Sequence, residues 1–327
     1  MNAPAQAKLE CGVYPGVPED EYFKWEAVSN SRLTPLLKSP AHCLYAMTHP
    51  SEPTAAMTLG SAVDCLVLTP TLWNERFSVA EQCYGHTKKR DRCSKNGNRP
   101  VHVDFFDMNT SIRHWYCSQH GPEDYPSYAT SKMGWTGDEI TGLSPDQSST
   151  AYAMAKAVHD HPGASALLDS CEEKQLSLVW RENNLLCKGR LDGLSSELKT
   201  VIDLKTCADA SPEAFSRKIA DFGYHRQAAM YLRGATYHGI DVKNYVIIAV
   251  EEPPPHAVAL YTLTERIPSA LGRMGDRLSP VEYGNHELLR LLDLYEQCEA
   301  TGKWPSYPEK PVAISLPAWT VAKAERE

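Results

Sequence analysis

The stretch Cys187–Thr206, CKGRLDGLSSELKTVIDLKT, has the pattern of a β-hairpin. The apolar run at 185–187 leads into Gly189–Gly193, and Ser195–Glu197 supplies polar residues typical of a turn. A second apolar strand follows at Val201–Lys205. The hairpin is the feature from which the organisation of the rest of the chain can be predicted.

Charged side chains gather at this hairpin. Alternation along a strand places Asp203 and Lys205 on one face and Ile202 and Leu204 on the other. Asp192 stands at the end of the neighbouring strand, where it can converge with Asp203. Two carboxylates and an ammonium are costly to assemble unless they bind something, and carboxylates suit a divalent cation. The lysine could orient or deprotonate a water molecule. The alternative is a solvated surface pair.

Three ordered motifs resemble a known nuclease superfamily. G-R-L-D-G followed by V-I-D-L-K-T resembles the core of the PD-(D/E)XK nucleases. Downstream, Tyr224–Leu232 resembles the Q-x-x-x-Y helix of the RecB-like and exonuclease VIII (RecE-like) branch, and upstream Gly60–Pro70 resembles its first motif. The resemblance implies an α/β restriction-endonuclease-like core with a mixed central sheet flanked by helices.

The first motif departs from the family pattern at Asp64, where the family usually has histidine, and Leu191 stands where proline is usual. Asp64 falls in the middle of an apolar helix predicted over Met57–Thr69. An unpaired carboxylate on a buried helix is costly, so it should face either solvent or a metal. The resemblance implies the metal, and aspartate can still bind a hard cation.

Further site residues follow from the resemblance and from helix geometry. In related exonucleases an acidic residue at the start of the first strand faces the metals, which implies Glu173, with Glu172 as the alternative. The Leu204 carbonyl is a further expected metal ligand. Gln227 and Tyr231 are four residues apart and share one helical face. They could orient the water or the DNA backbone, or Tyr231 could be a core residue.

Residues 81–135 differ from the rest of the chain. The segment is poor in aliphatic residues and fits neither a helical nor a strand period. Thiolates and imidazoles are preferred zinc ligands. The segment contains the spacing C-x9-C-x23-C-x2-H, which predicts a small zinc-stapled insertion held by Cys83, Cys93, Cys117 and His120. Three other histidines are alternative ligands, namely His86, His102 and His114. Unrelated reduced cysteines in a loop are the competing interpretation.

The distribution of charge favours contact between this segment and DNA. The chain has a net charge of −8, which is unfavourable for phosphate binding as a whole. From Cys83 to Arg99 there are six basic residues and one acidic residue, so this stretch carries +5 and the remainder −13. The insertion could equally be a protein-docking element. The expected DNA-binding residues are Arg32, Lys88, Lys89, Arg90 and Arg92.

Length and composition set the broad class. A chain of 327 residues with 42% hydrophobic content can bury a sizeable core. We expect an N-terminal helical part of the core at 1–80, the insertion at 81–135, and the remaining core with a C-terminal helical segment at 136–327. No run of about 18 apolar residues is present, so no membrane contact is expected. The N-terminal residues lack a signal pattern, which favours the cytosol of a bacterium or of a phage-infected host.

The other elements are predicted from caps and periodicity. Residues 1–20 should be extended or mobile. Serine caps begin helices near 29, 144 and 211, and a helical segment is expected over 267–298. The buried strand at 244–250 should form a hairpin with 256–262.

These features together predict a deoxyribonuclease that depends on Mg²⁺ or Mn²⁺ and carries a structural Zn²⁺. The resemblance to RecE-like enzymes implies a phage-type recombination exonuclease that digests duplex DNA from ends. It also implies a ring-shaped homo-oligomer and a single-strand annealing protein as partner. Two alternatives stay open: an endonuclease with the same site, and a non-catalytic zinc-finger module that binds DNA or protein.

Overall fold

The computed structural model describes residues 9–79, 141–266 and 278–315 with their side chains, and the backbone of 99–105, 110–116 and 133–136. Its main element is a six-stranded mixed sheet of order β1-β7-β8-β9-β10-β11, in which only β9 and β10 run parallel. The strands are β1 (Gly12–Tyr14), β7 (Glu173–Glu182), β8 (Leu185–Ser195), β9 (Thr200–Cys207), β10 (Asn244–Glu251) and β11 (Val258–Thr262).

The predicted hairpin is β8 and β9, and its two strands separate soon after the turn. β8 pairs with β7 from Leu185 to Leu194. It pairs with β9 only through Gly193–Ser195, opposite residues 200–202. Beyond this short ladder β9 continues beside β10 as far as Cys207. The sheet is therefore split between β8 and β9 at the position of Asp192 and Asp203.

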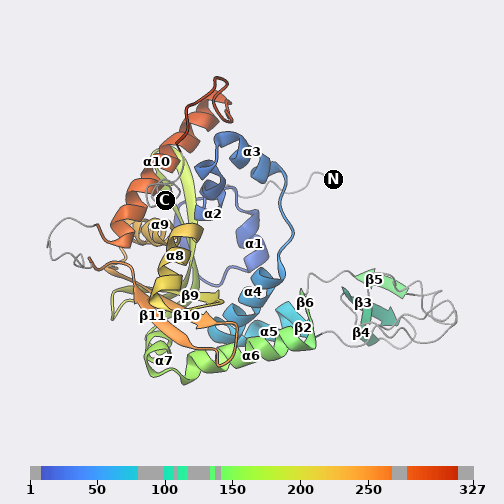
Figure 1. The fold of residues 1–327 in the computed structure, drawn as a ribbon. Coiled ribbons are helices and arrows are strands. Elements are labelled where there is room, and N and C mark those ends of the chain that lie inside the picture. The colour runs from blue at the N-terminus through green and yellow to red at the C-terminus, as the bar shows by residue number, and fades with distance from the viewer. Residues whose placement is uncertain are drawn as a thin grey trace, which may run out of the picture.

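Helices cover both faces of the sheet, and each face has its own hydrophobic core. One core joins β7 and β8 to α2, α3, α8, α9 and α10, and the other joins Ile202, Leu204 and Ile248 to α4, α6 and α7. Figure 1 shows α8, α9 and α10 along one side of the sheet. The helices are α1 (Glu19–Lys24), α2 (Asn30–Leu33), α3 (Pro40–Thr48), α4 (Ala55–Leu68), α5 (Trp73–Arg76), α6 (Pro145–Asp160), α7 (Pro162–Asp169), α8 (Pro212–Phe222), α9 (Tyr224–Tyr237) and α10 (Pro280–Thr301), with 3₁₀ turns at Thr34–Leu37 and Pro70–Leu72.

Three helix starts, those of α2, α6 and α8, follow the predicted caps at Ser29, Ser144 and Ser211, although Ser211 makes no side-chain capping hydrogen bond. The Ser29 hydroxyl accepts a hydrogen bond from the Arg32 amide at 3.3 Å, and Ser144 forms a capping box with Gln147. The prediction of extended chain at the N-terminus agrees with the edge strand at 12–14 but not with residues 19 and 20, which lie in α1. In the predicted C-terminal helical segment, the described helix begins at Pro280, after a capping box made by Ser279. None of the helices within the described residues could span a membrane.

Residues 81–135, which as a whole fit no strand period, nevertheless contain strands. Their described backbone forms β3 (Arg99–Phe105), β4 (Thr110–Tyr116) and β5 (Met133–Thr136), an antiparallel sheet of order β4-β3-β5. The alternation of Val101, Val103 and Phe105 with polar residues indicates a strand, but polar surroundings hide it in a longer window. The predicted zinc ligands Cys83, Cys93, Cys117 and His120 lie outside the described residues.

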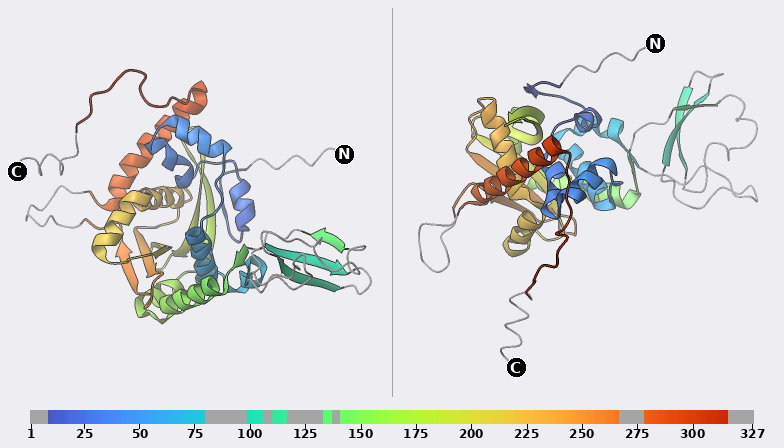
Figure 2. Two further views of the ribbon diagram at one scale, coloured as in Figure 1. Left: turned by 45° about the vertical axis from the view of Figure 1, so that its right-hand side comes forward. Right: turned by 90° about the horizontal axis from the view of Figure 1, so that it is seen from above.

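The two ends of this segment meet at one place. β2 (Phe77–Val79) pairs in parallel with β6 (Thr141–Leu143), so the chain leaves the core and returns to it side by side. All the views in Figures 1 and 2 show the three-stranded sheet standing beside β2 and β6, apart from the six-stranded sheet. This arrangement is the one expected of an insertion between the first two helical parts of the core, although the predicted domain boundaries stay a prediction.

Candidate active site

The predicted acidic residues meet where β8 and β9 separate. Asp192 comes from β8, Asp203 and Lys205 come from β9, and Asp64 comes from α4 on the neighbouring layer. The Lys205 Nζ atom lies 2.7 Å from Asp203 Oδ2, and the side chain of Asp203 is 2% exposed. Asp64 and Asp192 each interact electrostatically with the other and with Lys205. Residues 64 and 203 are far apart along the chain, so the site exists only in the folded protein.

The split in the sheet explains how Asp192 is held. Since the β8–β9 ladder ends at Gly193 and Ile202, the Leu204 amide has no ladder partner on β8. It donates instead to Asp192 Oδ2 at 2.8 Å. The Leu204 N–H thus has a positioning role, while the expected role of its carbonyl as a metal ligand stays a prediction. The Leu204 N–H, which would otherwise be an unpaired donor inside the strand, therefore helps to position Asp192.

The carboxylates of the site are buried and repel one another, so their charged forms are unfavourable. Burial, with the charge of Asp192, raises the pKa of Asp64 well above its usual range. Burial, with the charge of Asp203, raises the pKa of Asp192 to about 6. Burial alone would lower the pKa of Lys205, but Asp203 and Asp192 outweigh it and raise that pKa. One ammonium does not balance three neighbouring carboxylates, so the cluster favours a further cation.

The donor atoms fit a hard divalent cation. Asp203 Oδ2 is buried and, within the described residues, accepts no hydrogen bond beyond its ion pair with Lys205. Carboxylate oxygens are the ligands preferred by Mg²⁺ and Mn²⁺. Within the part of the chain that the structure describes, no three His, Cys, Asp or Glu side chains are arranged so that they could hold a metal ion. Asp64, Asp192 and Asp203 are near enough to interact electrostatically, and their role as metal ligands stays a prediction.

Helix α9 covers the site from the other side. Gln227 Nε2 donates to Asp203 Oδ1 at 3.4 Å and to the Tyr231 hydroxyl at 3.1 Å, so the predicted pair does act on one helical face. Burial, with the charge of Asp203, raises the pKa of Tyr231 to about 12, so its hydroxyl stays protonated. The helix can lie this close because Gly189 has no side chain: a Cβ there would be 2.9 Å from the Tyr231 ring.

The predicted acidic residue at the start of β7 does not join the cluster. Glu173 pairs with Leu194 in the sheet, and among the described residues it forms no hydrogen bond or ion pair with the aspartates. Its neighbour Glu172 accepts a hydrogen bond from the Ser196 amide at 2.8 Å and so holds the β8–β9 turn. A metal-ligand role of Glu173 stays a prediction.

Gln175 is the β7 residue that reaches the site. Gln175 Nε2 donates to Asp192 Oδ1 at 3.5 Å, and Arg190 Nε donates to Gln175 Oε1 at 2.6 Å. Gln175 has a φ of 55°, a left-handed conformation that is rare outside glycine and often found at functional sites. Sequence reasoning missed this residue, which lies between Lys174 and Leu176, the partners of Gly193 and Leu191 in the β7–β8 register.

Two aromatic residues next to the charged groups were also missed. The Lys205 ammonium lies 5.2 Å from the centre of the Tyr224 ring, a cation–π contact at the start of α9. Burial, with the charge of Asp203, raises the pKa of Tyr245 well above its usual range. Aromatic residues flanking an apolar strand or opening a helix have no sequence signal that separates them from ordinary core residues.

The expected DNA-binding residues are placed only in part. Arg32 is half-buried in α2 and interacts with Tyr295 of α10. Its predicted contact with DNA stays a prediction. The basic residues Lys88, Lys89, Arg90 and Arg92 lie outside the described residues.

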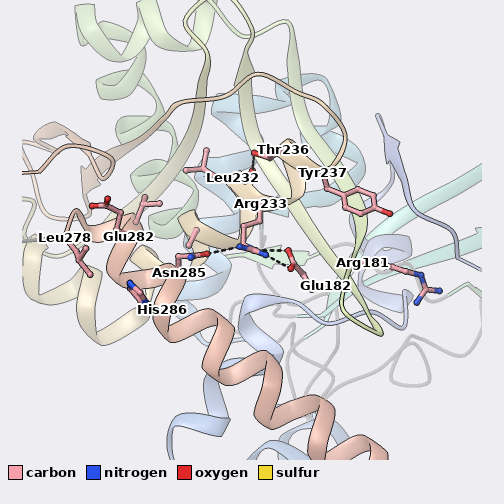
Figure 3. A pocket seen from close by; sticks show the side chains of 12 residues that line it. Arg181, Glu182, Leu232, Arg233, Thr236, Tyr237, Leu278, Glu282, Asn285 and His286 are labelled. Atoms are coloured by element: carbon pink, nitrogen blue, oxygen red, sulfur yellow. Dashed lines mark hydrogen bonds and ion pairs between the residues drawn. The ribbon is translucent and has the colours of Figure 1, made fainter.

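A separate pocket of about 630 Å³ lies on the far side of α9. Its wall includes Leu232, Arg233 and Thr236, which are on the helix face opposite Gln227. Figure 3 shows Arg233 reaching across to Glu182, to which Nη2 pairs at 2.6 Å. The pocket is not the candidate active site, because its Arg233 is already paired with Glu182 and the aspartates do not line it.

A split mixed sheet with acidic residues and a lysine at the split defines a restriction-endonuclease-like nuclease fold. The chain matches the model of the family described as a PDDEXK-like domain of unknown function (DUF3799) over residues 29–315. The protein belongs to this family. The resemblance of the three motifs to the PD-(D/E)XK superfamily is thereby confirmed.

One solved structure supports the fold. A protein from Eubacterium rectale described as a "Putative exonuclease" has a TM-score of 0.50 and 11% identity, over 91% of this chain and 96% of its own. A second structure, SSO0001, has a TM-score of 0.27 and 16% identity over 47% of this chain and 65% of its own. No curated protein sequence matches the chain. The family and the fold support a nuclease.

Proposed function

We propose that the protein is a Mg²⁺-dependent deoxyribonuclease that hydrolyses phosphodiester bonds of DNA. The observation that carries the proposal is the meeting of Asp64, Asp192, Asp203 and Lys205 at the split between β8 and β9. A buried group of mutually repelling carboxylates destabilises the protein unless it binds a cation. Family membership favours phosphodiester hydrolysis over other uses of such a site.

Each side chain has a distinct part in this proposal. Asp64, Asp192 and Asp203 would hold the metal, which activates water and stabilises charge on the phosphate. Lys205, held by Asp203 and by the Tyr224 ring, orients the attacking water and places a positive charge beside the reacting phosphate. Gln227 holds Asp203 Oδ1, and Tyr231 holds the Gln227 amide. The second oxygen of Asp203 forms the ion pair with Lys205 at 2.7 Å.

The finer proposal is an exonuclease of the phage recombination type that degrades duplex DNA from ends. It is supported by the resemblance of the motifs to RecE-like enzymes and by the description of the Eubacterium rectale protein as an exonuclease. A homo-oligomer, a single-strand annealing protein as partner, and action in the cytosol of a bacterium or phage-infected host belong to the same proposal.

The test compares linear end-labelled duplex DNA with a closed circular plasmid, each with Mg²⁺ and with EDTA. We expect Mg²⁺-dependent loss of the linear DNA only, and activity near background for Asp203→Asn. Asp169→Asn, an exposed aspartate on α7, is the matched control and should keep full activity. Cutting of the circular plasmid would show that the enzyme is an endonuclease and not an exonuclease. Equal activity of Asp203→Asn and the wild type would remove the assignment of this site.

A further inference from the structure

Arg190 lies beside the candidate active site and is not used in the proposed hydrolysis. It stands two residues before Asp192 on β8, which is about 6.6 Å along a strand. Its Nε donates to Gln175 Oε1 at 2.6 Å, and the Gln175 amide in turn donates to Asp192 Oδ1 at 3.5 Å. The amide group of Gln175 therefore separates the guanidinium from the carboxylates.

The guanidinium of Arg190 interacts electrostatically with Asp192 but is not paired with it. Within the described residues it forms no ion pair with a carboxylate, and its Nη1 is buried without a hydrogen-bond partner. The guanidinium packs on the ring of Tyr22, with its Cζ 5.8 Å from the ring centre. A buried, unpaired guanidinium nitrogen costs stability and needs an explanation. The side chain is half-buried, so part of it stays accessible to a ligand.

Neighbouring side chains add positive charge. Lys188 lies two residues before Arg190 on β8, contacts the same Tyr22 ring at 4.6 Å, and donates to the carbonyls of Tyr22 and Trp25, at 2.8 and 2.9 Å. Arg76 is close enough that the charge of Arg190 adds to burial in lowering its pKa. Glu19 pairs with Arg76. Three cations with one paired carboxylate thus stand next to the acidic cluster.

We propose that Arg190 binds a phosphate of the cleaved DNA strand, next to the phosphate that is cut. This inference rests on the proposed function and assigns a binding residue to that site. A guanidinium prefers phosphate oxygens, and the accessible part of the Arg190 side chain would bind one. The phosphate cannot be the reacting one, because Gln175 fills the space between Arg190 and Asp192. Arg190 would then set how the strand enters the site.

The competing role is structural, with Arg190 only holding Tyr22 and α1 against the sheet. The two roles differ in their dependence on salt. A phosphate contact adds about 0.9 to the slope of log affinity against log salt concentration, whereas a structural contact adds nothing to it. Substitution by lysine keeps the charge but loses the planar fork, so it should keep the slope and weaken affinity only in part.

The experiment measures binding of a fluorescent duplex by anisotropy in EDTA over a series of NaCl concentrations. It uses the full chain with Asp203→Asn, which prevents turnover. On that background Arg190→Gln should weaken binding about ten-fold, the size expected for one charge-assisted contact, and lower the salt slope by about 0.9. Arg190→Lys should keep the slope. The control Arg181→Gln, an exposed arginine on β7 that bonds the Asn184 carbonyl, should change affinity less than about two-fold.

In protein that keeps Asp203, assayed with Mg²⁺, Arg190→Gln should raise KM about ten-fold and leave kcat within about two-fold. The reason is that Arg190 contacts the bound DNA but not the reacting phosphate. Thermal unfolding identifies a variant that fails to fold. Unchanged affinity and slope in a folded Arg190→Gln protein would overturn the Arg190 inference and leave the nuclease proposal intact. Absence of DNA binding by the Asp203→Asn parent would overturn both. Binding that depends on Arg190 without any cleavage by the wild type would overturn the nuclease proposal and leave Arg190 as a DNA-binding residue only.

Discussion

Replacing Asp192 with asparagine is expected to stabilise the metal-free protein while abolishing its activity. Asparagine has nearly the shape of aspartate, and its oxygen can still accept the hydrogen bond from the Leu204 amide. The substitution removes a carboxylate that sits beside Asp203 and Asp64 in a buried place. Function and stability should therefore respond in opposite directions at this position.

The magnitude follows from the pKa of Asp192. That pKa rises from 3.8 to about 6 because of burial and the neighbouring Asp203. The native state thus holds the proton of Asp192 more tightly than the unfolded chain does. The contribution of Asp192 to stability is therefore greatest below pH 3.8 and is lost as the pH rises through about 6. The loss at pH 8 is up to about 3 kcal/mol, and at pH 5 it is about half of that. The neutral asparagine of the Asp192→Asn variant avoids this loss at both pH values.

Urea denaturation in EDTA at pH 5 and pH 8 measures the effect. Asp192→Asn should be up to about 3 kcal/mol more stable than the wild type at pH 8, with a smaller gain at pH 5. Asp192→Ala is the contrast: it leaves the Leu204 amide without an acceptor and should gain less or lose stability. Added Mg²⁺ should stabilise the wild type more than Asp192→Asn. The reasoning is refuted if Asp192→Asn shows no gain at pH 8, or a gain that does not shrink at pH 5.

Two other predictions concern packing and zinc. A Cβ at Gly284 of α10 would lie 2.1 Å from the His225 carbonyl oxygen, whereas one at Gly60 of α4 would lie 3.4 Å from Thr206 Oγ1. Gly284→Ala should therefore lower the free energy of unfolding by about 2 kcal/mol, displace α9 with Gln227 and lower activity. Gly60→Ala should raise the free energy of unfolding by up to about 1 kcal/mol. Equal thermal stability of the two variants would contradict this. Metal analysis should find about one zinc per chain, lost in Cys117→Ser; zinc-free wild-type protein would end the zinc prediction.

The hairpin and its charged face could be predicted because their signals are local. Alternation along Val201–Lys205 separates Asp203 and Lys205 from Ile202 and Leu204, and the structure places the apolar pair in the core beside α4 and α6. The spacing of Gln227 and Tyr231 in a helix is equally local. The motif resemblance then predicted the superfamily, which the family match confirms.

The parts that sequence reasoning missed depend on strand register and on close packing. Gln175 reaches Asp192 because of an unusual φ and its place on the neighbouring strand β7, and Tyr22 reaches Arg190 from a short helix far away in the sequence. The resemblance to related exonucleases implied an acidic residue at the start of this strand, Glu173, and gave no signal for Gln175. Such contacts have no periodic signal in the sequence.

The sequence by itself determined which chemistry is possible: hard oxygen donors, an ammonium and a hairpin that presents them. The tertiary structure alone decided that these groups meet, by ending the β8–β9 ladder at Gly193, turning the Leu204 amide to Asp192, and laying α4 and α9 against the opening. The physical reason is that alternation and helical spacing act over a few residues. The approach of Asp64 to Asp203 depends instead on how two hydrophobic cores pack on opposite faces of one sheet.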